Sequence, residues 1–280
     1  MCRLLGWVAQ PGLTLRTALG DDNYPAFTEL SRIHADGWGI AYAADEDLNV
    51  RKSPAVASAD PEFAALSSYA ATEAAVAHLR WATPGLPVEQ RNTHPFRYGD
   101  SAFAHNGGIY PLDRLPRLLT PQWQARLTGM TDSEHYYLAI MAEVEDNGVD
   151  LPTAIVRVTA HLADAYVPSS LNAMLLTADA LYVISCYDPT VRPVLPQPRP
   201  STDGTPMAPR ESDETYFDLR YRRTEQSVLV ASSGFPQPTA AGWELLPNNS
   251  LLVINRTTMH CEELPLNVQL QASATASRPR

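Results

Sequence analysis

The sequence is poor in cysteine, in net positive charge and in long hydrophobic runs. Its 280 residues include three cysteines, an odd number at distant positions, which argues against a disulfide framework or a zinc ribbon. The formal charge is −10, so the chain lacks the positive surface that binding to nucleic acid or to an anionic membrane normally requires. No apolar run approaches the roughly 18 residues of a membrane span. We therefore expect a soluble protein with neither a nucleic-acid nor a membrane partner.

Signals for secretion, nucleotide binding and metal binding are also missing. The apolar stretch after Met1 is too short for a secretory signal, which favours the cytoplasm. Neither a glycine-rich phosphate loop nor a dinucleotide fingerprint occurs. His34, His94 and His105 match no recognisable ligand spacing, so they are interpreted as hydrogen-bonding loop residues. We expect no metal and no other cofactor.

Short apolar runs rich in Val, Ile and Leu occur from end to end and predict strands, with helices between them. The predicted strands are Cys2–Val8, Gly37–Tyr42, Ala74–Leu79, Ser101–His105, Leu171–Thr177, Leu181–Tyr187, Ser227–Ser232 and Leu251–Asn255. The predicted helices are Pro61–Tyr69, Ser133–Glu145 and Leu151–Ala163. Strands, then helices, then strands again indicate an α+β fold rather than a regular βαβ winding.

Two segments stand apart in composition. Residues 189–213 hold seven of the 24 prolines and few large apolar side chains, which predicts a long exposed loop. The tail, residues 271–280, is small and polar in composition and is predicted to be disordered. Neither segment is typical of a boundary between two cores, so we expect one domain over residues 1–270 with the loop inserted in it.

Cys2 differs from the other two cysteines because of its position. Initiator methionine is generally removed before a small side chain, which would leave Cys2 with a thiol and a free α-amine on neighbouring carbons. A terminal amine has a pKa of about 7.7–8.0 and a thiol about 8.5, so the amine can act as base toward its own side chain. Taken alone, the position is explained as well by a structural cysteine in a first strand, the interpretation favoured until the other motifs are considered. Burial as small hydrophobic residues is expected for Cys186 and Cys261.

Further along, three motifs carry polar groups at the ends of predicted elements. Arg80, in His-Leu-Arg-Trp-Ala-Thr-Pro-Gly, has a planar fork suited to a carboxylate. Asn106 and Gly107 place an amide and flexible main-chain N–H groups at a strand end, as an oxyanion hole requires. Asp132 precedes a helix, where it either caps the helix or meets a substrate ammonium. Trp38 and Trp81 are interpreted as packing residues.

Taken in order, these motifs resemble the class II glutamine amidotransferases, which are cysteine-type N-terminal nucleophile hydrolases. The opening Met-Cys-Arg-Leu-Leu-Gly and the block Asp-Gly-Trp-Gly at residues 36–39 are most similar to the stand-alone branch. That branch includes the γ-glutamyl amidohydrolase of ergothioneine biosynthesis and the amidotransferase-like subunit of a glutathione-degrading complex. The resemblance is specific from Cys2 to about Asp132 and looser to about Asn255. It implies an αββα sandwich, two antiparallel sheets between helical layers.

The resemblance also implies roles for individual residues. Cys2 would be the nucleophile, with its α-amine as general base, and Asn106 and Gly107 would hold the oxyanion. The implied substrate-binding residues are Arg80 for the α-carboxylate, Thr83 and His94 for the shape of that pocket, and Asp132 for the α-ammonium.

Two functions follow from these expectations. The first is hydrolysis of a γ-glutamyl amide bond, in glutamine or a γ-glutamyl conjugate, through a Cys2 thioester that releases glutamate. The alternative is a glutaminase subunit that passes ammonia to, or depends on, a separate partner chain; a homo-oligomer is also left open. One departure bears on the choice. Stand-alone members often have Val-Ala-Ser-Glu-Pro in a late strand, whereas here Ser233 stands in place of the glutamate.

Overall fold

The strands of the chain form two antiparallel sheets. The computed structural model describes residues 2–44, 47–200, 215–268 and 270. Within these residues a seven-stranded sheet has the order β11-β9-β10-β1-β4-β2-β3 and a six-stranded sheet the order β13-β12-β8-β7-β6-β5. The first sheet consists of β1 (Arg3–Leu13), β2 (Trp38–Ala44), β3 (Asp47–Ser53), β4 (Thr72–Leu79), β9 (Leu219–Arg223), β10 (Ser227–Ser232) and β11 (Trp243–Leu245). The second consists of β5 (Phe96–Tyr98), β6 (Ser101–Tyr110), β7 (Val167–Leu176), β8 (Ala180–Ser185), β12 (Ser250–Asn255) and β13 (Cys261–Pro265).

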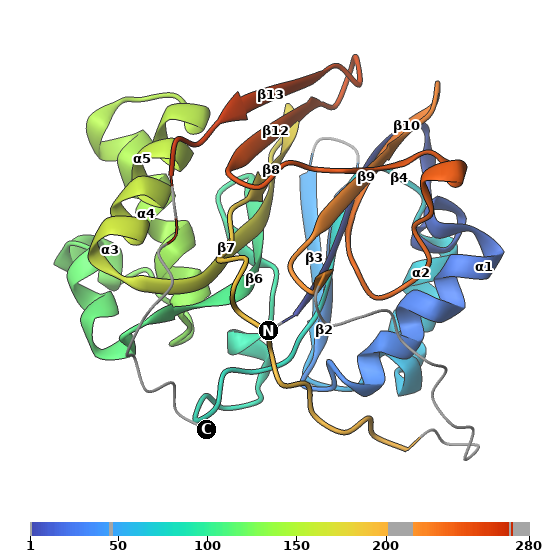
Figure 1. Cartoon of the computed structure of the whole chain (residues 1–280), viewed down its shortest axis with the longest axis horizontal. Coiled ribbons are helices and arrows are strands. Elements are labelled where there is room, and N and C mark those ends of the chain that lie inside the picture. Colours follow the sequence, from blue (N-terminus) through green and yellow to red (C-terminus); the bar gives the residue numbers. More distant parts are fainter. Residues whose placement is uncertain (1, 45–46, 201–214, 269, 271–280) are drawn as a thin grey trace.

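Helices cover the outer face of each sheet, so the molecule has four layers (Figure 1). Helices α1 (Leu15–Glu29) and α2 (Pro61–Tyr69) lie on the seven-stranded sheet. Helices α3 (Pro121–Gln124), α4 (Asp132–Asn147) and α5 (Leu151–Ala165) lie against the six-stranded sheet. This arrangement is the αββα sandwich expected from the sequence. None of the helices in the described part of the chain has the length and apolar character that a membrane span requires.

Three apolar layers hold the sandwich together, because side chains alternate between the two faces of each strand. On β1, Leu4 and Val8 point into the layer between the sheets, whereas Leu5 and Trp7 point toward α1 and α2. On β6, Ala104 faces the inter-sheet layer and Phe103 faces α4, where its ring stacks on Tyr137 with the centroids 5.1 Å apart. Strands buried on both faces explain why the apolar runs of the sequence are continuous.

Each predicted strand and helix coincides with or overlaps an observed element, and α2 has the predicted bounds. The sequence reading missed α1, whose pattern is interrupted by Pro25 and by Gly20, the latter with φ 79°. It also missed the short or polar strands β3, β5, β9, β11 and β13, because strands with exposed polar residues give a weak apolar signal. The predicted tail lies outside the described residues, as do residues 201–213 of the predicted loop. Residues 189–200 contain neither helix nor strand.

The topology brings the predicted motifs together. Strands β1 and β4 are antiparallel neighbours in which Arg3 pairs with Leu79, so the start of β1 lies beside the end of β4. Cys2 and Arg80 are therefore neighbours although 78 positions separate them in the sequence. Strand β6 packs across from β1 and β4 in the facing sheet. The site thus forms where the two sheets meet.

Candidate active site

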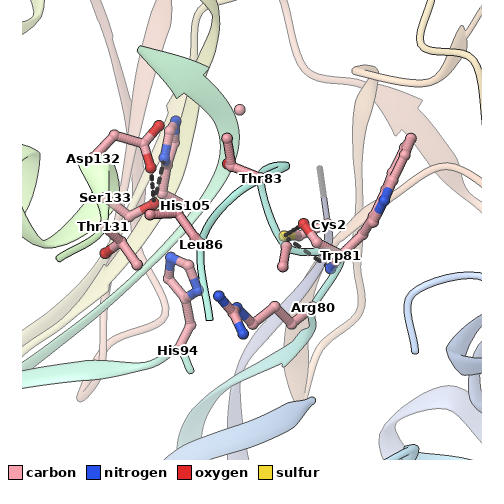
Figure 2. A pocket seen from close by; sticks show the side chains of 12 residues that line it. Cys2, Arg80, Trp81, Thr83, Leu86, His94, His105, Thr131, Asp132 and Ser133 are labelled. Atoms are coloured by element: carbon pink, nitrogen blue, oxygen red, sulfur yellow. Dashed lines mark hydrogen bonds between the residues drawn. The ribbon is translucent and has the colours of Figure 1, made fainter. Parts of the chain in front are cut away.

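Six of the seven predicted site residues line one pocket, the Cys2 pocket (Figure 2). Its volume is about 290 Å³, including the open space at its mouth. Its lining comes from the start of β1, the loop after β4, the loop before β5, strand β6 and the first turn of α4. The lining residues are Cys2, Arg80, Trp81, Ala82, Thr83, Leu86, His94, His105, Gly107, Thr131, Asp132 and Ser133.

Cys2 is held on both sides of its α-carbon. Its main-chain nitrogen donates to Asn106 Oδ1 at 2.7 Å. Its sulfur lies 3.5 Å from the main-chain nitrogen of Trp81 and 3.6 Å from the carbonyl oxygen of the same residue. The residue is 5% exposed, yet it lines the pocket. The amine and the thiol of Cys2 are therefore fixed relative to each other at the pocket wall.

Asn106, the remaining predicted site residue, reaches Cys2 from the facing sheet. It follows the inward-facing Ala104 by two positions on β6, so strand alternation directs its side chain between the sheets. Its Oδ1 is occupied by Cys2, whereas its buried Nδ2 has no hydrogen-bond partner among the described residues. A buried amide donor without a partner is costly unless a ligand atom satisfies it. This donor is available to an oxygen bound beside Cys2.

Gly107 lies next on β6, where the chain passes close to β7. A Cβ atom at this position would come within 1.9 Å of the carbonyl oxygen of Ser170. Glycine is therefore required here by the close approach of the two strands rather than by an unusual backbone angle. The absence of a side chain also leaves the main chain of Gly107 as part of the pocket wall.

Arg80 brings a buried positive charge to the pocket. The residue is 2% exposed, and its guanidinium donates to two main-chain carbonyls, those of Asp36 and Pro87, each at 3.3 Å. In the described ranges it forms no ion pair with a carboxylate. Burial lowers its pKa, and the negative charges of Cys2, Asp36 and Asp132 oppose that effect. A buried guanidinium that has neutral partners alone fits an anionic ligand.

Asp132 brings the complementary charge, and the structure corrects one interpretation of it. The helix cap is Thr131, whose side chain accepts from the main-chain nitrogen of Glu134 at 3.1 Å. Asp132 is instead the first residue of α4, is 2% exposed, and accepts from the main-chain nitrogen of Ile109 through Oδ2 at 2.9 Å. It has no cationic partner within the described residues. The alternative of a plain helix cap is therefore wrong.

His105 contacts Ser133, the neighbour of Asp132 in the first turn of α4. Its Nε2 lies 3.0 Å from the carbonyl oxygen of Ser170, which can only accept, so the neutral ring donates there. Its Nδ1 then accepts from the hydroxyl of Ser133 at 2.9 Å, whereas that hydroxyl lies 3.4 Å from Asp132 Oδ1. The second carboxylate oxygen of Asp132 keeps acceptor capacity toward the pocket.

Burial keeps three histidines uncharged: His94 and His105 line the pocket, and His78 packs against His94. Burial lowers the pKa of His78 to about 3 and holds the pKa of His94 well below its ordinary value. Burial also lowers the pKa of His105, against the opposing charge of Asp132. The rings of His78 and His94 lie with centroids 4.2 Å apart, and both ring nitrogens of His94 are buried without partners among the described residues. A neutral His94 therefore offers one donor and one acceptor at the pocket wall.

The sequence reading missed several participants. The main chain of Trp81 contacts the sulfur of Cys2, and the hydroxyl of Ser133 donates to His105. The sequence could not indicate either contact, because every residue has main-chain groups and serine is common at many kinds of position. Trp38 packs fully buried on Phe63, as predicted. Among the described residues no cluster of His, Cys, Asp and Glu has the composition of a metal site.

The other two cysteines differ from each other. Cys186 is fully buried, as predicted, and burial raises the pKa of its thiol to about 12. Cys261 is only partly buried at the start of β13, which corrects the expectation that it is buried. Strand β13 is an edge strand of the six-stranded sheet, with β12 as its neighbour on one side, and this explains why Cys261 stays partly exposed.

The comparisons with known proteins agree with this geometry. A family model of the class II glutamine amidotransferases matches residues 1–274. The chain belongs to this family. Class II glutamine amidotransferases are enzymes that hydrolyse an amide C–N bond, so the family and the enzyme class predicted from the sequence are confirmed.

Two relatives and one solved structure illustrate the range of the family. A probable glutamine amidotransferase of Saccharomyces cerevisiae, DUG3, is 25% identical over 81% of this chain and 71% of its own length. The γ-glutamyl-hercynylcysteine sulfoxide hydrolase of Mycobacterium tuberculosis is 32% identical over 39% of this chain, and the match spans half of that protein. The glutamine phosphoribosylpyrophosphate amidotransferase of Bacillus subtilis, 14% identical, superposes with a TM-score of 0.60 over 96% of this chain and 50% of its own. This last likeness confirms the fold class.

Proposed function

We propose that this class II amidotransferase hydrolyses a γ-glutamyl amide bond through a thioester at Cys2 and releases glutamate. One observation carries the proposal. The Cys2 pocket is lined by a buried guanidinium, Arg80, and a buried carboxylate, Asp132, and neither has an ion-pair partner among the described residues. An α-amino acid group, with its carboxylate and ammonium, offers one partner to each.

The reaction begins with proton transfer within Cys2. In the mature chain the α-amine donates one N–H to Asn106 Oδ1, which leaves its lone pair for the thiol proton. The thiolate attacks the γ-carbonyl carbon, and the carbonyl oxygen becomes an oxyanion. The unpartnered Nδ2 of Asn106 and the main chain of Gly107 supply the donors for that oxygen. Collapse of the intermediate breaks the C–N bond, and the ammonium of Cys2 protonates the leaving amine.

Water completes the cycle. It attacks the thioester carbonyl, transfers a proton to the α-amine, and glutamate leaves as the thiol of Cys2 takes back its proton. Thr83 and His94 line the same pocket and limit the space around the glutamyl chain. Arg80 and Asp132 hold the substrate at its α-carbon through both half-reactions.

The relatives support a small γ-glutamyl substrate. The mycobacterial relatives are named for hydrolysis of a γ-glutamyl conjugate, and the yeast relative for glutamine amidotransfer. Because the matched region covers about half of the mycobacterial proteins, their particular leaving group is not assigned to this chain. The three cysteines are free, which agrees with a cytoplasmic enzyme.

Labelling with a diazo-ketone analogue of glutamine tests the site. Such a reagent should alkylate Cys2 in a one-to-one ratio and spare Cys186 and Cys261, as determined by peptide mass spectrometry. The labelled protein should lack Met1, because the α-amine must be free to act as base. Cys2→Ser should abolish labelling at this position. Alkylation elsewhere, or full activity in protein that retains Met1, would contradict the mechanism.

A panel of γ-glutamyl compounds tests the need for a partner. The protein alone should release glutamate from at least one member of the panel, with Cys2→Ser as the blank. Labelling at Cys2 without turnover until a second protein is added would favour the alternative, a glutaminase subunit of a larger enzyme.

A further inference from the structure

The carbonyl group of Cys2 is held by a residue that no motif identified. Tyr216 is 1% exposed, and its hydroxyl donates to the carbonyl oxygen of Cys2 at 3.3 Å. Tyr216 lies three positions before β9, so the connection from β8 in one sheet to β9 in the other brings it to the start of β1. A residue 214 positions away in the sequence therefore contacts the proposed nucleophile.

Tyr216 is itself fixed to the seven-stranded sheet. The guanidinium of Arg3 stacks on its ring, with Cζ 3.9 Å from the centroid, and donates to its carbonyl oxygen at 2.9 Å. The hydroxyl of Ser233 donates to the carbonyl oxygen of Thr215 at 2.7 Å. Ser233 is the position where stand-alone relatives often carry glutamate, and here it anchors the segment that bears Tyr216.

The same segment is also tied to the six-stranded sheet. The side-chain nitrogen of Asn172, on β7, donates to the carbonyl oxygen of Phe217 at 2.6 Å. The rings of Phe217 and Tyr187 stack with centroids 6.0 Å apart, and the hydroxyl of Tyr187 donates to Asp218. The segment 215–218 is therefore braced by both sheets, which makes it a rigid support.

These contacts complete a three-point hold on Cys2. Asn106 fixes its nitrogen, the main chain of Trp81 fixes its sulfur, and Tyr216 fixes its carbonyl oxygen. The hydrogen bond from Tyr216 fixes the orientation of the peptide plane between Cys2 and Arg3, and the α-carbon, the amine and the thiol of Cys2 extend from that plane. A tilt of this plane would displace the amine and the thiol together, so the bond to the carbonyl oxygen complements the contacts to the nitrogen and the sulfur.

We propose that Tyr216 is a positioning residue that holds the main chain of Cys2 so that its amine and thiol keep the geometry needed for attack. The proposal rests on the proposed function at Cys2. Small displacements of a reacting group cost large factors in rate, so a residue that acts through Cys2 should affect kcat rather than substrate binding.

The test is Tyr216→Phe, which removes the hydroxyl but keeps the ring under Arg3. The matched control is Tyr166→Phe, which removes the hydroxyl of another buried tyrosine that donates to a main-chain carbonyl, that of Arg114 at 3.1 Å, and that belongs neither to the lining of the Cys2 pocket nor to segment 215–218. Tyr216→Phe should lower kcat about tenfold with KM within twofold of the wild-type value, and should slow alkylation of Cys2 by iodoacetamide to a similar degree. Tyr166→Phe should leave kcat and the alkylation rate within twofold.

The outcomes separate this proposal from the proposed function. Wild-type kcat in Tyr216→Phe, an equal loss in both variants, or a change confined to KM would overturn the positioning role while the function at Cys2 stands. Absence of turnover and of Cys2 labelling in the wild-type protein would overturn the function itself. Thermal unfolding of both variants establishes that a loss of kcat occurs in folded protein.

Discussion

The guanidinium of Arg80 and the carboxylate of Asp132 are both buried in the same pocket wall, and each has main-chain partners in place of an opposite charge. A buried charge without an opposite charge beside it destabilises a folded protein, so stability does not explain why Arg80 and Asp132 are buried here. Under the proposed function, binding of an α-amino acid group supplies an explanation, because the substrate would bring the missing charges. Arg80 and Asp132 would then select the part of the substrate that does not react.

Arg80→Lys should raise KM at least tenfold. Lysine keeps the charge but loses the planar fork that pairs with both oxygens of a carboxylate. Leaving a buried carboxylate poorly paired costs about 2–5 kcal/mol, and each ~1.4 kcal/mol is a factor of ten. Steady-state kinetics on the best γ-glutamyl substrate measure the effect. An unchanged KM would show that the α-carboxylate is anchored elsewhere.

Asn106→Asp separates the two tasks of this side chain. Aspartate retains an oxygen to accept from Cys2 but replaces the donor Nδ2 with a second acceptor. We expect kcat to fall by about 10²–10³ with little change in KM, as for loss of one oxyanion donor. Substantial kcat in this variant would remove Asn106 from the oxyanion role, and a change in KM alone would make it a binding residue.

At the scale of elements, α4 presents Asp132 through its first turn. The cap is Thr131, and Glu134 in the same turn accepts from the main-chain nitrogens of Thr128 and Gly129 at 2.9 and 2.7 Å. The negative side chains of this turn also suit the positive end of the helix dipole. The position of Asp132, the proposed partner of the substrate ammonium, therefore depends on the first turn of α4.

Thr131→Ala should lower both stability and substrate affinity. Loss of an N-cap costs about 1 kcal/mol and frays the first turn, so Asp132 is held less well and KM should rise several-fold. The matched control is Asp150→Ala, which removes the N-cap of α5, a helix that does not line the pocket. The control should lower the midpoint of thermal unfolding without a change in KM. Equal KM values for the two variants would contradict the link between the cap and the site.

Strand β6 directs neighbouring side chains to the two opposite faces of the six-stranded sheet. Asn106 faces Cys2 between the sheets, whereas His105 faces Ser133 at the start of α4. Successive side chains of a strand point to opposite faces, so a shift of one residue in the pairing of β6 with β7 would exchange these partners. The pairing of Asn106 with Asn172 is part of the register that prevents this exchange.

At the scale of the whole molecule, the buried histidines make stability depend on pH. Burial lowers the pKa of His78, His94 and His105 in the folded state, whereas an unfolded histidine titrates near 6.5. Below pH 6.5 the unfolded chain therefore binds protons that the folded chain excludes. The free energy of unfolding falls as pH decreases through this range.

The expected size is about 1 kcal/mol for His78 between pH 6.5 and 5.5, because its pKa of about 3 lies below this interval, and His94 and His105 add to the fall in the same direction. Asp and Glu with ordinary pKa values stay ionised over this interval, which limits their contribution. Denaturant unfolding at pH 7.5, 6.5 and 5.5 measures it. A profile that is flat between 6.5 and 5.5 would show that these rings are not kept neutral in the folded protein.

The sequence predicts the order of the short strands, the helix Pro61–Tyr69, the helix from Leu151 to within two residues of its observed end, and the motifs around Cys2, Arg80 and Asn106. Each of these depends on local periodicity or on the chemistry of a few adjacent residues. Polar edge strands such as β3 and the kinked helix α1 do not, since tertiary packing overrides a weak local pattern there.

The partners within the site were decided by the tertiary structure alone. The sequence offered Asp132 as either a helix cap or a ligand, and the structure shows that Thr131 is the cap whereas Asp132 accepts from the main-chain nitrogen of Ile109. Tyr216 had no signal at all, because its task depends on the crossing from β8 to β9 and on three elements that meet at Cys2. The sequence determines which chemical groups are available to the site. The register of the two facing sheets determines which of these groups are in contact, because contacts between residues far apart in the chain leave no local pattern in the sequence.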